Sequence, residues 1–221
     1  SNLYETVEVK LKIGTEKGNF DADKYIKFLS KDLKGKKINF LDIGAADLFM
    51  YPGLHNTMCL NKYFAFDINE SIMIKGLDYI KNNYETSNIV INKGNNFNFS
   101  KIPKYSIDIA FCQAVCSHLT LNSQIIMFRN LYSKMKKINS KFYCSYLLFE
   151  NDSLDEPYNY TWLKKQKFDG KDHIVNSFFQ KNPYHYNLKT ISLVSEYCGW
   201  KIVKCHDYDH DVQKMIEFKI I

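Results

Sequence analysis

Two aspartates lie at or near the ends of two successive strand-like runs, and the residues around them are of the types that bind a nucleotide. The first run, 38–43, carries Asp42 and stops at a turn of small residues, Gly-Ala-Ala at 44–46. A strand that enters such a turn before a helix brings backbone N–H groups close to a ligand. The second run, 62–67, ends in Asp67, and about 20 residues typically separate a nucleotide-binding turn from a ribose-binding carboxylate. The pair predicts a nucleotide-like cofactor.

The elements that must position these residues are those of an α/β sheet. Short apolar runs alternate with helical patterns along most of the chain, which indicates parallel βαβ units. The predicted strands are 38–43, 62–67, 88–92, 107–112, 141–149, 200–205 and 214–220. The predicted helices, each with apolar residues on one face, are 21–33, 69–80, 122–137 and 187–198.

Local signals set the boundaries of several elements. Asn69 and Asn187 can cap the helices that follow them, because an amide oxygen accepts a hydrogen bond from the first free N–H groups. Between 46 and 61 we expect irregular chain, since Pro52 and Gly53 interrupt any long helix.

Composition narrows the class of protein and its partners. With 221 residues, 45% of them hydrophobic, one α/β domain can bury a sizeable core. The net charge of +6 is spread over predicted helix faces and turns, which suits an anionic small substrate and is too diffuse for nucleic acid. We find no apolar run long enough to span a membrane and no secretory leader pattern, and therefore expect a cytoplasmic protein.

The six cysteines are predicted to be buried, reduced thiols. They are scattered, without a CxxC pair or a ladder of short spacings. Cys112 and Cys116 are four residues apart, but a metal role there is disfavoured, and no short spacing between histidines supports a metal site either. We therefore expect no metal site.

The motifs around the two aspartates resemble those of class I S-adenosylmethionine-dependent methyltransferases. The matching segments are 41–47 (LDIGAAD), 64–69 (FAFDIN), 94–96 (GNN) and 107–119 (IDIAFCQAVCSHL). The first motif of that family is usually Asp-x-Gly-x-Gly-x-Gly; here Gly44 is present, and Ala46 and Leu48 replace the other two glycines. The resemblance implies a Rossmann-like, seven-stranded, mostly parallel sheet with an antiparallel last strand, helices on both faces and an aromatic insertion before the last helix.

The resemblance also implies the cofactor S-adenosylmethionine and assigns residues to it. Gly44 and Ala45 would pass beneath the methionine part, and Asp67 would accept hydrogen bonds from the ribose hydroxyls. Ile68 would pack on the adenine, and the amide oxygen of Asn95 could accept a hydrogen bond from the adenine amino group. The full set assigned to the cofactor is Asp42, Gly44, Ala45, Ala46, Asp67, Ile68, Asn95, Asn96, Gln113 and Ala114. Without the family, Asp42 and Asp67 could simply cap the turns that follow them.

The same resemblance places the acceptor beside the fourth strand and the C-terminal third. His118, a few residues past that strand, is the candidate base that would remove a hydroxyl proton. It could equally be a helix-start histidine with packing and capping contacts only. The residues assigned to the acceptor are His185, Tyr186, His210, Gln213 and Tyr146.

We expect a single domain over 1–221 with four parts. These are an N-terminal segment and helix at 1–37, a cofactor-binding core at 38–149, an acceptor-side insertion or lid at 150–186, and a final helix and strand pair at 187–221. The aromatic residues of the insertion could stack on a sugar or base, or form a small satellite core: Tyr158, Tyr160, Trp162, Phe168, Phe178 and Phe179.

These signals predict a methyltransferase that O-methylates a small polar acceptor, such as a sugar or nucleotide-linked sugar of a capsule or surface polysaccharide pathway. One alternative is methylation of a phosphorylated metabolite or RNA, and another is a nicotinamide-dependent Rossmann enzyme. N-methylation of bases is disfavoured, because Cys112-Gln-Ala-Val stands where an Asn-Pro-Pro-Tyr-like motif would be needed. The lost glycines leave open a third alternative, a non-catalytic binding protein with a methyltransferase fold.

Overall fold

The computed structural model describes residues 20–33, 35–57, 59–148, 167–168, 171–172, 184–207 and 213–221. The helices are α1 (Phe20–Leu33), α2 (Met50–Asn56), α3 (Glu70–Ile80), α4 (Leu121–Tyr132) and α5 (Leu188–Tyr197), with a short 3-10 helix, η2 (Cys116–His118). The strands are β1 (Ile38–Ile43), β2 (Leu60–Asp67), β3 (Ile89–Lys93), β4 (Ile109–Cys112), β5 (Lys141–Tyr146), β6 (Lys167–Phe168), β7 (Lys171–Asp172), β8 (Trp200–His206) and β9 (Lys214–Ile220).

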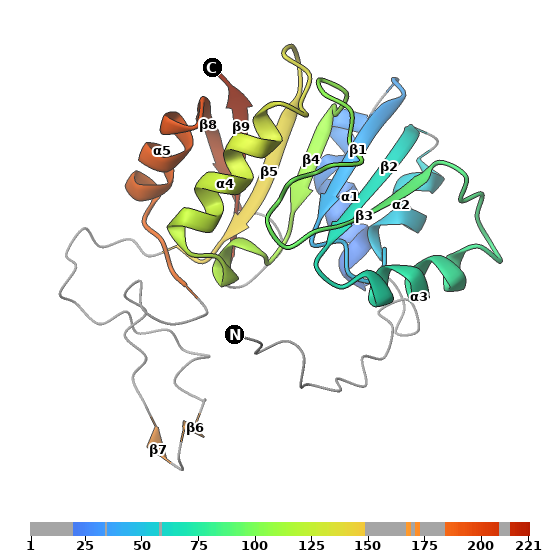
Figure 1. Cartoon of the computed structure of the whole chain (residues 1–221), viewed down its shortest axis with the longest axis horizontal. Helices are drawn as coiled ribbons and strands as arrows, with labels where there is room; N and C mark the ends of the chain where they lie inside the picture. Colours follow the sequence, from blue (N-terminus) through green and yellow to red (C-terminus); the bar gives the residue numbers. More distant parts are fainter. Residues whose placement is uncertain are drawn as a thin grey trace.

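Seven of the strands form one sheet in the order β3-β2-β1-β4-β5-β9-β8 (Figure 1). The first five pair in parallel, β9 is antiparallel to β5, and β8 is antiparallel to β9 at the sheet edge. This confirms the predicted fold class for the described part of the chain. Along the chain, β1, β2 and β3 lie one beside the next toward one side of the sheet, and β4 then pairs with the other side of β1. In such sheets the ligand binds where the strand order reverses, here between β1 and β4.

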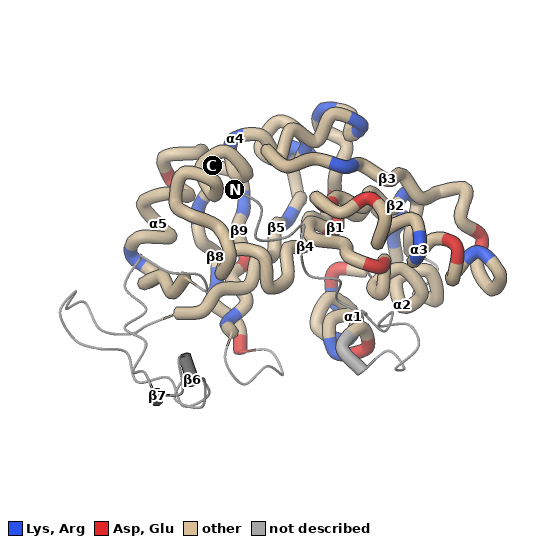
Figure 2. Tube along the Cα trace, turned by 60° about the horizontal axis from the view of Figure 1, so that its bottom comes forward, with Lys and Arg blue, Asp and Glu red and all other residues tan. Residues whose placement is uncertain are grey.

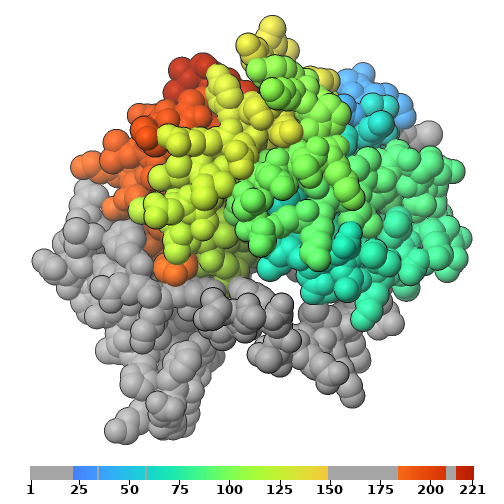
Figure 3. Space-filling model, in the orientation of Figure 1, coloured from blue at the N-terminus to red at the C-terminus, as the bar shows by residue number. Residues whose placement is uncertain are grey.

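Alternate side chains of the strands build two cores, one on each face of the sheet. In β1, Leu41 and Ile43 pack into the core that α4 and α5 cover, whereas Phe40 packs into the core that α1, α2 and α3 cover. Figure 1 shows α4 and α5 in front of the sheet with α1 and α2 behind it. In the space-filling view of Figure 3, the chain around α4 covers the centre of the front face. Helices therefore lie on both faces, as predicted.

The connection from β1 to β2 departs from the sequence prediction. We expected irregular chain at 46–61, but Met50–Asn56 form α2. Pro52 is the third residue of this helix, where a backbone N–H has no partner within the helix, so the proline breaks no hydrogen bond. Burial of Met50, Tyr51 and Leu54 in the core stabilises the helix.

Helix α4 ends at Tyr132 instead of the predicted residue 137. The residues that follow turn back toward the sheet, where Met135 forms a bridge with Ile107. Lys136 Nζ also donates to the Asp108 carboxylate at 2.7 Å. These contacts with distant residues replace further helical turns, and the helical pattern alone could not reveal them.

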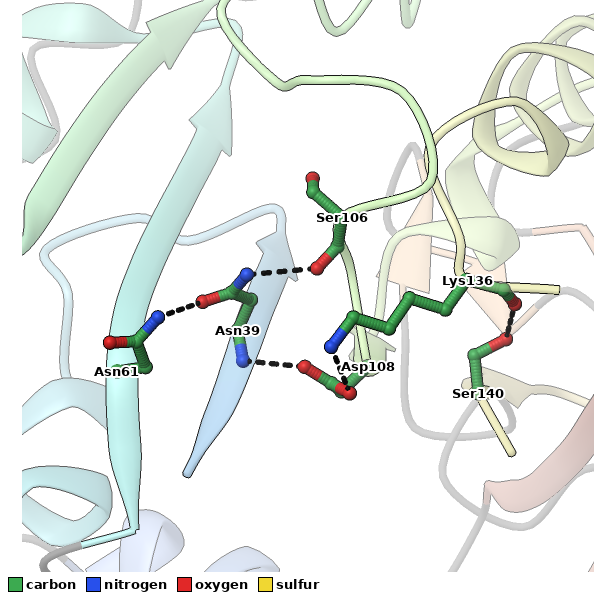
Figure 4. Close-up of polar contacts among 6 residues, drawn as sticks. All are labelled: Asn39, Asn61, Ser106, Asp108, Lys136 and Ser140. Carbon is green, nitrogen blue, oxygen red and sulfur yellow. Dashed lines mark hydrogen bonds and ion pairs between the residues drawn. The ribbon is translucent and has the colours of Figure 1, made fainter. Parts of the chain in front are cut away.

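Hydrogen bonds join the chain at the amino ends of the parallel strands, which form the amino edge of the sheet (Figure 4). The Asn39 backbone N–H donates to Asp108 Oδ2 at 2.9 Å, and its side-chain amide donates to the Ser106 carbonyl at 2.9 Å. Its side-chain oxygen accepts from Asn61 at 2.8 Å, and Lys136 neutralises Asp108. Because these groups satisfy one another, this edge is structural, and a ligand site is expected at the opposite, carboxyl edge.

Some predictions fall outside the described residues. These are the whole segment before α1 (1–19), His210, and the insertion at 150–186 apart from β6, β7 and 184–186, including its proposed aromatic lid. Within the part of the chain that the structure describes, no helix is long and apolar enough to cross a membrane.

Candidate functional site

The turn after β1 has the left-handed backbone that favours glycine, although two of the residues with this conformation are not glycine. The φ angles are +81° at Gly44, +44° at Ala46 and +63° at Leu48. A side chain in this left-handed region crowds its own backbone, at a cost of roughly 1–2 kcal/mol per residue. These are the three positions at which the resembled family has glycine. The turn therefore has a left-handed backbone at all three positions, at an energetic cost at Ala46 and Leu48.

Close packing fixes the shape of this turn. The Gly44 N–H donates to the Phe66 carbonyl of β2 at 2.8 Å. A Cβ on Gly44 would lie 2.4 Å from Val115 Cγ2, and a Cβ on Gly76 in α3 would lie 2.0 Å from the Asp47 carbonyl oxygen. The absence of side chains at these two glycines lets the segment after β4 and helix α3 approach the turn.

The Asp67 carboxylate faces the turn from the end of β2. Its Oδ2 accepts the Ala46 N–H at 3.0 Å, and its Oδ1 accepts the Asn69 N–H at 2.8 Å. Each carboxylate oxygen can accept a second hydrogen bond, and the side chain is partly exposed. Asp67 is thus oriented by the backbone and still able to accept hydrogen bonds from the two hydroxyls of a ribose.

The Asp42 carboxylate, in contrast, is buried within the sheet. It accepts a hydrogen bond from the Tyr63 hydroxyl at 2.5 Å. Burial raises the pKa of Asp42 to about 7; the Tyr63 hydrogen bond opposes this rise, and the charges of Asp67 and Asp47 add to it. Asp42 therefore links β1 to β2 beneath the turn. A direct contact with the cofactor stays a prediction.

An apolar side chain follows Asp67, and two amide side chains follow β3. Ile68 is half exposed, and Asn95 and Asn96 are exposed in the segment after β3. Beside them, the rings of Phe66 and Phe97 stack with centroids 5.7 Å apart. Apolar side chains with nearby amides are suited to hold a planar base. The proposed contacts of these residues with adenine are not tested by the fold.

A hydrogen-bonded network joins the ends of β4 and β5 to the start of β9. The Ala114 N–H donates to Ser145 Oγ at 2.7 Å, and Ser145 Oγ donates to Gln213 Oε1 at 2.7 Å. Gln113 Nε2 donates to the same Gln213 oxygen at 3.1 Å. The network brings Gln113 and Ala114, assigned to the cofactor, together with Gln213, assigned to the acceptor. It fixes the floor of the carboxyl edge between β4 and β5.

His118 lies at the exposed end of η2. Its backbone N–H donates to the Val115 carbonyl at 2.8 Å, so the 3-10 turn fixes its position after β4. An exposed imidazole at the carboxyl edge is accessible to an acceptor, as a general base must be. Its role stays a prediction.

Three residues assigned to the acceptor are buried in the core. The Tyr186 hydroxyl donates to the Leu119 carbonyl at 2.5 Å, and the Tyr146 hydroxyl donates to Gln124 Oε1 at 3.0 Å. His185 is also fully buried. These side chains pack the fold around η2 and α4 in this structure, so their contact with an acceptor also stays a prediction.

Three further residues shape the site without a strong sequence signal. Ser145 lies within an aromatic strand, and its contact with Gln213 needs the β5–β9 pairing. Tyr63 reaches Asp42 only because β1 and β2 are neighbours. Gly76 had the best available signal, since an isolated glycine in a helix costs about 1 kcal/mol relative to alanine and usually has a packing reason.

No family model and no curated protein matches the sequence. Solved structures do match the fold. The mitomycin 7-O-methyltransferase MmcR is 10% identical over 90% of this chain and 54% of its own, with a TM-score of 0.67. A SAM-dependent methyltransferase from Aquifex aeolicus is 14% identical over 91% of this chain and 90% of its own, with a TM-score of 0.60. The magnesium protoporphyrin IX methyltransferase ChlM from Synechocystis PCC 6803, solved with bound SAH, is 15% identical over 90% of this chain and 82% of its own, with a TM-score of 0.63.

The chain therefore has the class I methyltransferase fold. The chain spans about half the length of MmcR and most of the length of the Aquifex structure. At 10–15% identity the likeness concerns the fold. The substrates named for MmcR and ChlM are mitomycin and magnesium protoporphyrin IX, and neither is a sugar.

Proposed function

We propose that this protein is an S-adenosylmethionine-dependent methyltransferase that acts on a small molecule. The observation that carries the proposal is the Asp67 carboxylate, anchored by two backbone N–H groups opposite the left-handed turn that starts at Gly44. The turn and the acid lie at the carboxyl edge of the sheet, beside the strand-order reversal where such folds bind their ligands.

The residues present fit the cofactor in type and placement. The turn at 44–46 would lie beneath the methionine part, Asp67 would hold the ribose, and Ile68 and Asn95 would hold the adenine. The cofactor would supply the methyl group on its sulfonium, and transfer to an acceptor is an in-line displacement. The work of the chain is then to orient the two reactants and to exclude water. The fixed floor formed by Gln113, Ala114 and Ser145 would serve that orientation.

We propose a hydroxyl group as the acceptor, with His118 as the base that takes its proton. Its exposed position after β4 supports this role. Lys and Arg residues are distributed over several elements, with acidic residues between them, in the described part of the chain (Figure 2). This distribution favours a small acceptor over nucleic acid. A sugar, sugar nucleotide or phosphorylated metabolite stays our proposal; because the structural neighbours act on other small molecules, aromatic hydroxyls belong in the same screen.

Calorimetric titration with S-adenosylhomocysteine tests the cofactor site. We expect binding by the unaltered chain and at least about a 100-fold loss of affinity in Asp67→Ala, because two charge-assisted hydrogen bonds to the ribose are removed. Asp78→Ala is the matched control, since Asp78 is an exposed aspartate of α3 that pairs with Lys81. Failure of the unaltered, folded chain to bind would refute the proposal and favour a non-catalytic binding protein.

His118→Ala tests the chemistry once an acceptor is found by screening. We expect kcat to fall by about 100-fold, within the usual range for general base catalysis, while affinity for S-adenosylhomocysteine is unchanged. The loss should shrink as the pH is raised, since solvent then removes the acceptor proton more readily. Normal turnover in this variant would exclude His118 as the base.

A further inference from the structure

Three cysteines from separate elements meet in the core, next to the floor of the carboxyl edge. Cys112 ends β4, Cys144 is its register partner in β5, and Cys116 begins η2. Their Sγ atoms all lie within 4.8 Å of one another, and those of Cys116 and Cys144 are 3.0 Å apart. All three side chains are fully buried. The strand pairing and the turn thus place three sulfur atoms around one point.

The size and chemistry of this cluster match the coordination shell of a thiophilic metal ion. Thiolate ligands select soft metals such as Cu⁺ and Zn²⁺. Three sulfurs that each lie about 2.3 Å from one ion are about 4 Å from each other. The three Sγ atoms already lie within 4.8 Å of one another, and those of Cys116 and Cys144 would have to separate from 3.0 Å by about 1 Å. Structural zinc is almost always four-coordinate. Among the described residues, no fourth His, Cys, Asp or Glu joins this group, so the donor set suits three-coordinate Cu⁺ better than Zn²⁺.

We propose that Cys112, Cys116 and Cys144 form a site for one thiophilic metal ion, best matched by Cu⁺. This inference rests on the sulfur geometry and is independent of the proposed methyl transfer. From the sequence we expected no metal site, because the cysteines are scattered without a CxxC pair; Cys144 joins Cys112 and Cys116 only in the folded chain.

Binding of the ion would be coupled to proton release. Thiolates are the ligands of such an ion, so each buried cysteine would release its proton to solvent as the ion binds and compensates the negative charge.

The position of the site gives the ion a structural effect. Cys112 and Cys116 enclose residues 113–115, which carry the floor of the carboxyl edge and the side chain that packs on Gly44. An ion bound to these two cysteines and to Cys144 would tie β4, η2 and β5 together. Because the ligand set exists only in the folded chain, binding would raise the thermal stability of the protein.

The test is an anaerobic titration of the reduced 221-residue chain with Cu⁺ against a chromophoric Cu⁺ chelator. We expect one ion per folded chain, release of protons on binding and a rise in melting temperature. Cys116→Ser and Cys144→Ser should bind at least about 100-fold more weakly, since loss of an outer-shell partner alone costs 10–100-fold. Cys59→Ser and Cys198→Ser, which alter cysteines outside the cluster, are matched controls and should bind like the unaltered chain.

Circular dichroism establishes that each variant is folded before its affinity is compared. If the serine variants do not fold, Cys116→Ala and Cys144→Ala take their place, because they remove the sulfur without adding a hydroxyl to the buried core, and they should weaken binding to the same extent. The proposal is overturned if the folded, unaltered chain retains no Cu⁺ against the chelator, or if the cluster variants bind as tightly as the controls. Isolation of Cys116 and Cys144 as a disulfide from the copper-treated chain would also overturn it.

Discussion

Replacing Gly76 by alanine should distort the turn after β1, residues 44–48, although alanine is the better helix former. The new Cβ would lie 2.0 Å from the Asp47 carbonyl oxygen, 2.5 Å from its carbon and 2.9 Å from its Cα. All three are backbone atoms, so no rotamer change can relieve the overlap. Helix α3 and the turn must separate by roughly 1.4 Å to reach ordinary contact at 3.4 Å.

Two opposing terms set the expected magnitude. Alanine gains about 1 kcal/mol in helix propensity, whereas overpacking typically costs 1–3 kcal/mol and more where backbone must shift. We expect a net loss of about 2 kcal/mol in the free energy of unfolding, or about 6 °C in melting temperature for a chain of this size. A displacement of the turn should also weaken binding of S-adenosylhomocysteine by at least about 10-fold.

Urea unfolding and calorimetric titration measure these two effects. Gly53→Ala is the matched control, because the three atoms nearest to its Cβ in α2 all belong to the side chain of Ile26, which is partly exposed and can move. It should change the free energy of unfolding by less than about 1 kcal/mol and leave binding unaltered. A Gly76→Ala protein as stable as the unaltered chain, with undiminished affinity, would show that the close approach of α3 does not shape the turn.

Two further perturbations test the turn and the acid beneath it. The pKa of Asp42 is 3.8 in the unfolded chain and about 7 in the folded chain, so the folded chain holds this proton more tightly. The contribution of protonated Asp42 to the free energy of unfolding is therefore full below pH 3.8 and is lost as the pH rises to about 7. Asp42→Asn removes this dependence on pH. Between about pH 5 and 8, the free energy of unfolding of the variant relative to that of the unaltered chain should rise by about 3 kcal/mol, as measured by urea unfolding. Parallel pH profiles of the two proteins would contradict the raised pKa. Ala46→Gly should stabilise the fold by about 0.5–1 kcal/mol, because relief of the left-handed strain exceeds the added entropy of the unfolded chain. Ala45→Gly, at a position without positive φ, should destabilise it, and equal effects of the two glycines on the urea midpoint would argue against strain at Ala46.

The fold was predictable because its signals are local and repeated. Apolar runs of strand length, helical apolar faces and the capping residues Asn69 and Asn187 each limited the local conformation, and both caps form as expected. Errors occurred where distant contacts outweigh local preference. The packing of Met50, Tyr51 and Leu54 forms α2 around a proline, and the bridge between Met135 and Ile107 ends α4 early.

The sequence by itself determined the βαβ alternation, the small-residue turn at 44–46 and the acid at Asp67, because a strand, a turn and the residue ending the next strand are defined by neighbours in the chain. Only the tertiary structure decided which distant side chains meet. Ser145 contacts Gln213 because β5 pairs with β9, and Asp42 contacts Tyr63 because β1 pairs with β2. Likewise, Cys144 joins Cys112 and Cys116 through the register of β4 and β5. Such contacts depend on strand order, and strand order is fixed by how both faces of the whole sheet are buried, which no local segment encodes.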